Sequence, residues 1–591
     1  MAARCLTGEL LHFPESLREN LYFMSALPQA TAQERSELFP VYLENMRQRF
    51  KSEINRFTGG DMARLLKGNG QAADLSFLMT YVYAWHWLRR HVPEAYRPAL
   101  LASFKGGSRA FLMELLEGSD SAGDFVTGYV GHWLATPGPG PAQREQLLRL
   151  LAHQGDDAQA LVQQVLTLWE GLGLFREPEK KAYARIAARE RSRYGEMLEQ
   201  VDRERLELID KIAQKPPKSV KFTKLGMIPH MGCPQTCRHC MFVWRPLVKG
   251  REQADQLYDL VDAHTSSVLF TGGDLTRHMG HFYKAIRRMR HVRTFAILLN
   301  GDFAHDRTAV QAMLGEMKQA LARRPGGWPK ARVLLQISFD EFHQEVILDR
   351  KGRLKERIPV AKIANIVEEA PKYPGIQLAL LHKQNCLNFS MDLFRQGVFG
   401  RLAAELGRRG HRLQVLSTAP SGRLKTNPYT GQRGQLLKDA SFVLEDYPDS
   451  PILLTSSTID AYGRAELLEP GEAVKEKEFL AEVLSRPRSP GQGFDTDLMF
   501  WFNGWATLFS AVHICLGNVY EEGADIVLAR QRKDPLSQAL ANFDRRLLDF
   551  YAEKRDDLPH HLEQATGPHH LFHVITQDAD MRLHMTRRLL A

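Results

Sequence analysis

An alternation of short apolar runs with helical patterns, between residues 216 and 425, most constrains the fold of this chain. Parallel strands need long crossover connections, usually helices, so this alternation predicts a parallel sheet. A common crossover hand curls such units one way, which favours an open or partial barrel of six βα units. The predicted strands cover 222–228, 267–271, 294–299, 333–339, 376–381 and 413–417. The predicted helices lie near 253–263, 277–289, 308–322, 360–369 and 393–409.

Two further regions flank this α/β segment. A chain of 591 residues exceeds the size of one core, so several domains are expected. Apolar residues at helical spacing predict an all-helical N-terminal domain over 1–215, ending before Pro216 and Pro217. Residues 426–591 predict a small α+β region, which includes a hairpin formed by 452–459 and 464–468.

Composition narrows the class of protein. Hydrophobic residues make up 44% and charged residues 25% of the chain, as in globular proteins generally. The net charge of +9 is small for this length, so nucleic acid is not indicated as a partner. Only six cysteines are present, which argues against a disulfide framework. With no signal-peptide pattern and no run long enough to span a membrane, we expect a cytoplasmic protein that makes no membrane contact.

Three of the six cysteines form a tight motif, Cys233-x3-Cys237-x2-Cys240, directly after the first predicted strand. Three thiolates in one loop suit iron–sulfur clusters. Three cysteines on a four-iron cubane leave one iron without a protein ligand, and that iron is open to a cofactor or substrate. The alternative is a structural zinc site, with His239 or His230 completing a Cys3His set.

Polar residues also follow the next two predicted strands. Gly272, Gly273 and Asp274 end the second strand, where glycines let a ligand approach the backbone closely. The Asp274 carboxylate can accept a hydrogen bond from an ammonium group, although a plain turn explains the same three residues. Asn300 ends the third strand.

The fourth predicted strand carries a polar stripe in the sequence LLQISFD. Ser338 and Asp340 share one face of it, and His343 follows just beyond. Barrel interiors are normally apolar, so a polar stripe at a strand's carboxyl end indicates a ligand site. For Asp340 and His343 the alternative is that they cap the next helix.

The cysteine loop resembles the signature of the radical S-adenosylmethionine (SAM) superfamily. The resemblance implies a partial (β/α)6 barrel over 216–425, a 4Fe–4S cluster on Cys233, Cys237 and Cys240, and SAM chelated by the open iron. It also implies an external one-electron reductant of the flavodoxin or ferredoxin type. His239 stands where family members usually have an aromatic residue.

The other polar positions resemble further elements of that family. Residues 272–274 resemble its GGE motif, with Asp274 in place of Glu and a reach shorter by one methylene. By analogy Asp274 contacts the SAM amino group, Ser338 lies near the SAM carboxylate or ribose, and Asn300 near the ribose. Asp340 and His343 are the catalytic candidates. Residues 419–423 resemble a P-x-G-R element in which Arg423 holds a carboxylate, or else form a turn with a surface arginine.

Residues 426–591 resemble the SPASM/twitch-type auxiliary domain of peptide-modifying radical SAM enzymes, reduced to a form without an auxiliary cluster because only Cys515 remains there. Cys515 is a candidate hydrogen-atom donor, as is the lone Cys386, but a lone cysteine is most often a small buried hydrophobe. Three functions stay open: a radical SAM enzyme acting on a peptide or protein, one acting on a small metabolite or nucleotide, and a zinc-binding scaffold without catalysis.

Overall fold

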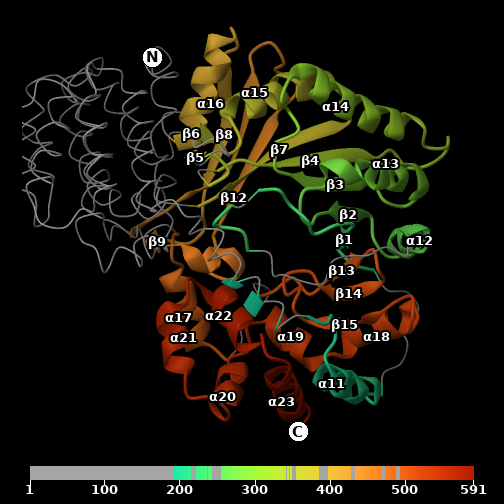
Figure 1. The fold of residues 1–591 in the computed structure, drawn as a ribbon, viewed down its shortest axis with the longest axis vertical. Coiled ribbons are helices and arrows are strands. Elements are labelled where there is room, and N and C mark those ends of the chain that lie inside the picture. Colours follow the sequence, from blue (N-terminus) through green and yellow to red (C-terminus); the bar gives the residue numbers. More distant parts are fainter. Residues whose placement is uncertain are drawn as a thin grey trace, which may run out of the picture.

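A computed structural model describes most of the chain from residue 185 onward (Figure 1). Within 185–591 it describes all residues except 187, 190–191, 193–194, 214–220, 236, 242–253, 341, 345, 349–353, 385–396, 427–432, 469–472 and 488–492. The predicted helical domain therefore lies almost wholly outside the described residues, as does Cys386. No helix of the described part is both long enough and apolar enough to cross a membrane.

The centre of the fold is one mixed sheet of 11 strands, in the order β15-β14-β13-β1-β2-β3-β4-β7-β12-β11-β8. The seven central strands, from β13 to β12, all run parallel, and the two edges are antiparallel. The protein is thus mixed α/β, as predicted. The central strands are β13 (Leu498–Trp501), β1 (Leu225–Ile228), β2 (Ser267–Phe270), β3 (Thr294–Leu299), β4 (Arg332–Ser338), β7 (Ile376–Lys383) and β12 (Ile452–Ser457).

Helices cover one face of this sheet, along the side marked by α13 to α16 in Figure 1. The burial pattern of β4 shows the two faces: Val333, Leu335 and Ile337 are buried, whereas Gln336 and Ser338 between them are half-buried. We call the second face, away from these helices, the open face. The covering helices are α12 (Ala254–His264), α13 (Met279–Arg288), α14 (Arg307–Ala322), α15 (Val360–Glu369) and α16 (Gly397–Arg408).

The sixth parallel strand is not the predicted one. β8 (Leu413–Pro420) lies at the sheet edge and pairs antiparallel with β11 (Leu437–Leu444), while β12 takes the sixth parallel place beside β7. The predicted hairpin is also wrong, because its second half is the 3-10 helix η8 (Gly463–Leu467). The segments that form β8 and β12 are both short and apolar, so only contacts distant in sequence decide which of the two pairs with β7.

The other edge of the sheet carries β14 (Trp505–Leu508) and β15 (Cys515–Asn518). Helix α11 (Gln200–Asp210) packs beside the C-terminal helices through two buried ion pairs, Arg205 with Asp534 at 2.5 Å and Arg582 with Asp202 at 2.6 Å. Within the described residues the range 426–591 contributes β11 to β15 to the same central sheet that carries β1 to β4 and β7. The helices of this part are α17 (Lys477–Ser485), α18 (Ala524–Lys533), α19 (Pro535–Ala541), α20 (Arg546–Ala552), α21 (Leu558–Gln564), α22 (Pro568–Ile575) and α23 (Ala579–Leu590).

Candidate cofactor site at the carboxyl ends of the parallel strands

The three cysteines lie in the loop that leaves the carboxyl end of β1, which we call the cysteine loop (residues 229–241). Cys233 is exposed, Cys240 half-buried and Cys237 buried, and none is in a disulfide. Burial raises the pKa of the Cys237 thiol to about 12, against the lowering effect of Arg357. Partial desolvation, opposed by a backbone hydrogen bond from Gln235, raises the pKa of Cys233, and Cys240 contributes to both shifts. Cys240 is thus close enough to both thiols to interact with them electrostatically.

Backbone hydrogen bonds fasten the cysteine loop to the loop after β2. The amide of Gly273 donates to the carbonyl of His230, and the amide of Asp274 to the carbonyl of Gly232, each at 2.9 Å. A Cβ on Gly273 would lie 2.2 Å from that Gly232 oxygen, and Gly272 has a φ of 140° that favours glycine. These glycines therefore allow the cysteine loop itself to approach closely. The sequence had indicated that they make room for a ligand.

Asp274 and Asn300 each retain a polar atom for a ligand. Asp274 Oδ1 accepts hydrogen bonds from the amide and hydroxyl of Thr276, at 3.1 and 2.6 Å, so half of the carboxylate serves the predicted turn. Asn300 Oδ1 accepts from the amide of Asp302 at 2.9 Å. The Asn300 Nδ2 donor is buried and meets no acceptor in the described part of the chain. A buried donor without a partner is costly, which indicates a position for a ligand acceptor.

Two side chains that the sequence did not single out hold the cysteine loop in place. Arg464, in η8, donates its backbone amide to the carbonyl of Cys240 at 3.0 Å and a guanidinium N–H to the carbonyl of Gln235 at 3.1 Å. The side-chain amide of Gln235 donates to Asp302 Oδ2 at 2.9 Å. Arg464 also lowers the pKa of Cys233 and Cys237 after larger contributions from burial. No local pattern reveals these roles, since the partners are 229 and 67 residues apart.

Asp340 connects the end of β4 to the cysteine loop. Its Oδ1 accepts from the amides of Phe342 and His343, at 3.1 and 3.0 Å, and lies 2.9 Å from His343 Nδ1. Its Oδ2 lies 3.4 Å from His239 Nε2. Burial opposes its ionisation, but the two imidazoles outweigh that effect and hold the pKa of Asp340 well below its usual range. Asp340 thus joins His343 to His239, which the sequence had offered only as a zinc ligand beside the cysteines.

His239 points inward. Its ring stacks on Phe342 at 4.8 Å and meets the His343 ring edge-on at 4.7 Å. Burial lowers the pKa of His239 to about 4, so the imidazole is neutral at pH 7. The ring is therefore packed against protein groups.

The open face of the sheet ends at these loops. Strand register aligns Ser338 with Leu381, and both are half-buried on the open face. Two residues further along β7, Lys383 donates to the hydroxyl of Ser457 at 2.9 Å and to the carbonyl of Thr458 at 3.1 Å. Burial lowers the pKa of Lys383, partly offset by Asp460 and Asp340. The end of the open face is therefore polar, and the Lys383 ammonium lies within electrostatic range of Cys240.

Two predicted residues lie apart from this site. Cys515 is buried at the start of β15, three strands from β1, in register with Thr507 and through it with Met499 and Gly226. It therefore does not lie at the level of the loop that follows Ile228. Arg423 sits 3.7 Å over the Phe479 ring and 3.6 Å from a Glu482 oxygen, so its charge faces a carboxylate of the protein itself.

The described residues contain one set of three or more His, Cys, Asp or Glu side chains whose ligand atoms all lie within 4.8 Å of one another: His239, Asp340 and His343. The three cysteines do not form such a set within the described part of the chain.

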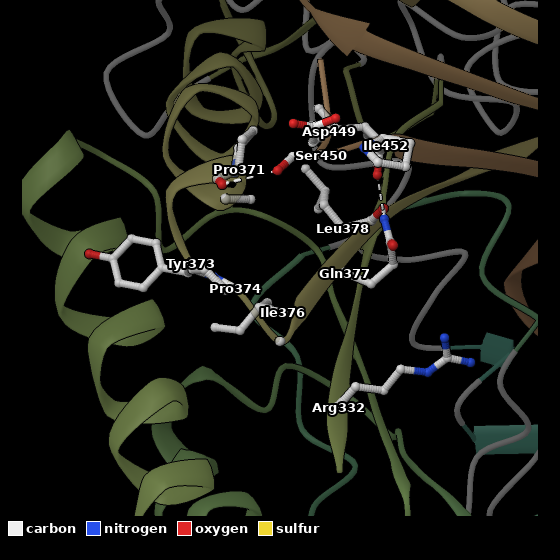
Figure 2. A pocket seen from close by; sticks show the side chains of 13 residues that line it. Arg332, Pro371, Tyr373, Pro374, Ile376, Gln377, Leu378, Asp449, Ser450 and Ile452 are labelled. Atoms are coloured by element: carbon white, nitrogen blue, oxygen red, sulfur yellow. Dashed lines mark hydrogen bonds between the residues drawn. The ribbon is translucent and has the colours of Figure 1, made fainter. Parts of the chain in front are cut away.

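A hollow lies at the opposite, amino ends of β4, β7 and β12. It has a volume of about 380 Å³ and is lined by Arg332, Tyr373, Gln377 and Asp449, among others (Figure 2).

Comparison of the sequence with known proteins gives no match: no family model and no curated protein matches it.

Proposed function

We propose that the protein is a radical SAM enzyme that acts on a peptide or protein, with the central sheet as its partial barrel. The observation that carries this proposal is the fastening of the cysteine loop to the Gly272–Asp274 loop at the carboxyl ends of β1 and β2. Ligands of open α/β sheets bind at the carboxyl ends of the strands. It supports the proposal that the residues predicted to bind the cofactors lie at or just beyond the carboxyl ends of β1 to β4, namely the three cysteines, Gly272, Gly273, Asp274, Asn300 and Ser338.

The residues at this end fit the two cofactors. Cys233, Cys237 and Cys240 would hold the 4Fe–4S cluster, since three free thiols in one loop suit an iron–sulfur cluster. Asn300 offers a buried donor without a partner to the SAM ribose, and Asp274 offers its Oδ2 to the SAM amino group. When bound, the cluster and SAM supply reductive cleavage of SAM and a 5′-deoxyadenosyl radical that abstracts hydrogen from the substrate.

The chain itself binds and orients. Arg464 binds the carbonyl groups of Gln235 and Cys240, and the Gln235 side-chain amide binds Asp302. The positive charge of Arg357 and Arg464 partly offsets the effect of burial on the Cys237 pKa. Asp340 is a positioning residue, since it is buried and holds the ring of His343. The His343 side chain is 12% exposed and can reach a substrate at the open face.

The substrate class rests on the resemblance of residues 426–591 to an auxiliary domain of peptide-modifying enzymes. We propose a flavodoxin or ferredoxin as the electron donor and the cytoplasm as the location. The small-metabolite alternative predicts that short peptides bind no better than free amino acids.

Anaerobic reconstitution with iron, sulfide, SAM and dithionite tests the enzyme proposal. We expect about four irons per chain and release of 5′-deoxyadenosine. In Cys240→Ala both should fall to background, whereas in Cys515→Ala, distant from the loop, both should persist. Stoichiometric zinc with no SAM cleavage would favour the scaffold alternative, and equal loss in the two variants would contradict the assigned roles.

A further inference from the structure

His239, Asp340 and His343 form a second cluster of potential metal ligands beside the cysteine loop. Their side chains are 5%, 1% and 12% exposed, and their ligand atoms all lie within 4.8 Å of one another. The three residues come from two segments 101 positions apart in the sequence, the cysteine loop and the end of β4. A buried set of two imidazoles and one carboxylate is a known ligand set for divalent transition metals.

The internal hydrogen bonds leave His239 incompletely paired. Its Nε2 lies 3.4 Å from Asp340 Oδ2, beyond the roughly 2.7–3.2 Å of ordinary N–H···O bonds. Its Nδ1 is buried and meets no partner in the described part of the chain. By contrast, the exposed pair of His291 and Asp262 closes to 2.9 Å. Buried polar atoms normally find good partners, so this loose contact indicates that another group belongs between the two side chains.

Two of the three pair distances suit a single ion. An ion about 2.0–2.2 Å from nitrogen and oxygen ligands brings neighbouring ligand atoms to roughly 3.0–3.5 Å from each other. The contact of His239 with Asp340 is 3.4 Å, and that of Asp340 with His343 is 2.9 Å. The surroundings already fix the ligands, because two backbone amides bind Asp340 Oδ1 and Phe342 stacks on His239.

We propose that His239, Asp340 and His343 bind one divalent transition metal ion, such as Zn²⁺ or Fe²⁺, distinct from any cluster on the cysteines. The ion would cross-link the cysteine loop to the end of β4. Lys383 lies within electrostatic range of both Asp340 and His239, and its charge weakens cation binding. Its ammonium is nevertheless directed to Ser457 and Thr458.

The test uses the full chain with Cys233, Cys237 and Cys240 all replaced by alanine, so that neither cluster nor thiolate binding contributes. After removal of metal, it is titrated with Co²⁺ without oxygen. We expect one equivalent of Co²⁺ with visible d–d bands and no intense sulfur-to-cobalt band, displaced by one equivalent of Zn²⁺. Adding His343→Gln or His239→Phe should weaken Co²⁺ binding at least tenfold, and adding His291→Gln should not.

Two outcomes would overturn the proposal: a folded triple variant, judged by circular dichroism, that binds no Co²⁺, or one that binds it equally well after His343→Gln. If the triple variant does not fold, metal content of the anaerobically purified wild type decides instead. We then expect one more non-cluster metal per chain than in His239→Phe, and equal content would refute the site. None of these readouts depends on SAM cleavage, so this proposal and the enzyme proposal fail separately.

Discussion

The two ends of the parallel strands differ sharply in chemistry. At the amino ends the structure has a cavity of about 380 Å³, whose lining closes on itself through ordinary contacts such as Ser450 Oγ to the carbonyl of Pro371 at 3.3 Å (Figure 2). At the carboxyl ends lie three free thiols, the carboxylate of Asp340 and a buried amide donor on Asn300 that has no acceptor among the described residues. The difference teaches that convergence of reactive groups locates this site better than the volume of a hollow.

The largest effect is expected where the cysteine loop meets its neighbour. Gly273→Ala places a Cβ 2.2 Å from the carbonyl oxygen of Gly232, so the loop must shift. We expect a cost of about 1–3 kcal/mol in unfolding free energy and loss of most bound iron. Gly280→Ala is the matched control, since nothing lies within 4 Å there. It should raise stability by about 0.5–1 kcal/mol and retain full iron content, measured by denaturant unfolding and iron analysis. Full iron content in Gly273→Ala would contradict the prediction that the cysteine loop must approach Gly273 closely to bind iron.

A buried histidine away from both ends provides a pH control. Burial lowers the pKa of His570 from 6.5 to about 4, and its Nδ1 accepts the amide of Thr566 at 3.1 Å. The unfolded chain binds the proton more readily, so this stability is complete above pH 6.5 and is lost as pH falls toward 4. The loss amounts to about 2–3 kcal/mol. Chemical unfolding of His570→Gln between pH 7 and 4 should show a flatter profile than wild type. An unchanged profile would contradict the assignment.

Arginines at the two ends sharpen the comparison. Arg464→Met removes the guanidinium bond to the carbonyl of Gln235 in the cysteine loop. A hydrogen bond from a charged group contributes about 1.5–3 kcal/mol, so iron should be lost to a chelator roughly tenfold faster. Arg332→Met, at the amino-end cavity, should leave that rate unchanged. Similar rates in both variants would mean that Arg464 does not stabilise the loop.

The smallest effect is expected at the cavity. Ser450→Ala removes the hydrogen bond to Pro371 and should cost about 0.5–1.5 kcal/mol in thermal or chemical unfolding. Iron content and SAM cleavage should equal those of wild type. A loss of SAM cleavage in the folded variant would show that the amino ends also contribute to the site.

Much of the central fold was predictable because its signals are local. The first five parallel strands lie within a few residues of their predicted positions, and helix α15 spans the predicted residues 360–369. The prediction of the sixth parallel strand was wrong because β8 and β12 are both short apolar runs, and their pairing is set by partners distant in sequence. The segment between the two expected hairpin strands does not form a turn between strands. It leads into η8, whose first residue, Gly463, has a positive φ of 62°.

The candidate site was predictable only in its motifs. The cysteine spacing, Asp274, Asn300 and Ser338 follow strands that the pattern revealed, so their common edge could be expected. Arg464 and Asp302 carry no local signal, since their roles come from contacts with Gln235 far away in the chain. The sequence offered His239 as a zinc ligand and as a departure from the family pattern, but its contact with Asp340 appears only in the fold.

Electron paramagnetic resonance of the anaerobically reconstituted, dithionite-reduced protein tests the central claim most directly. The account predicts the signal of a reduced 4Fe–4S cluster that changes shape when SAM is added, because SAM binds an iron that the three cysteines leave open. A cluster signal that SAM leaves unaltered, or a protein that takes up no iron, would contradict the account.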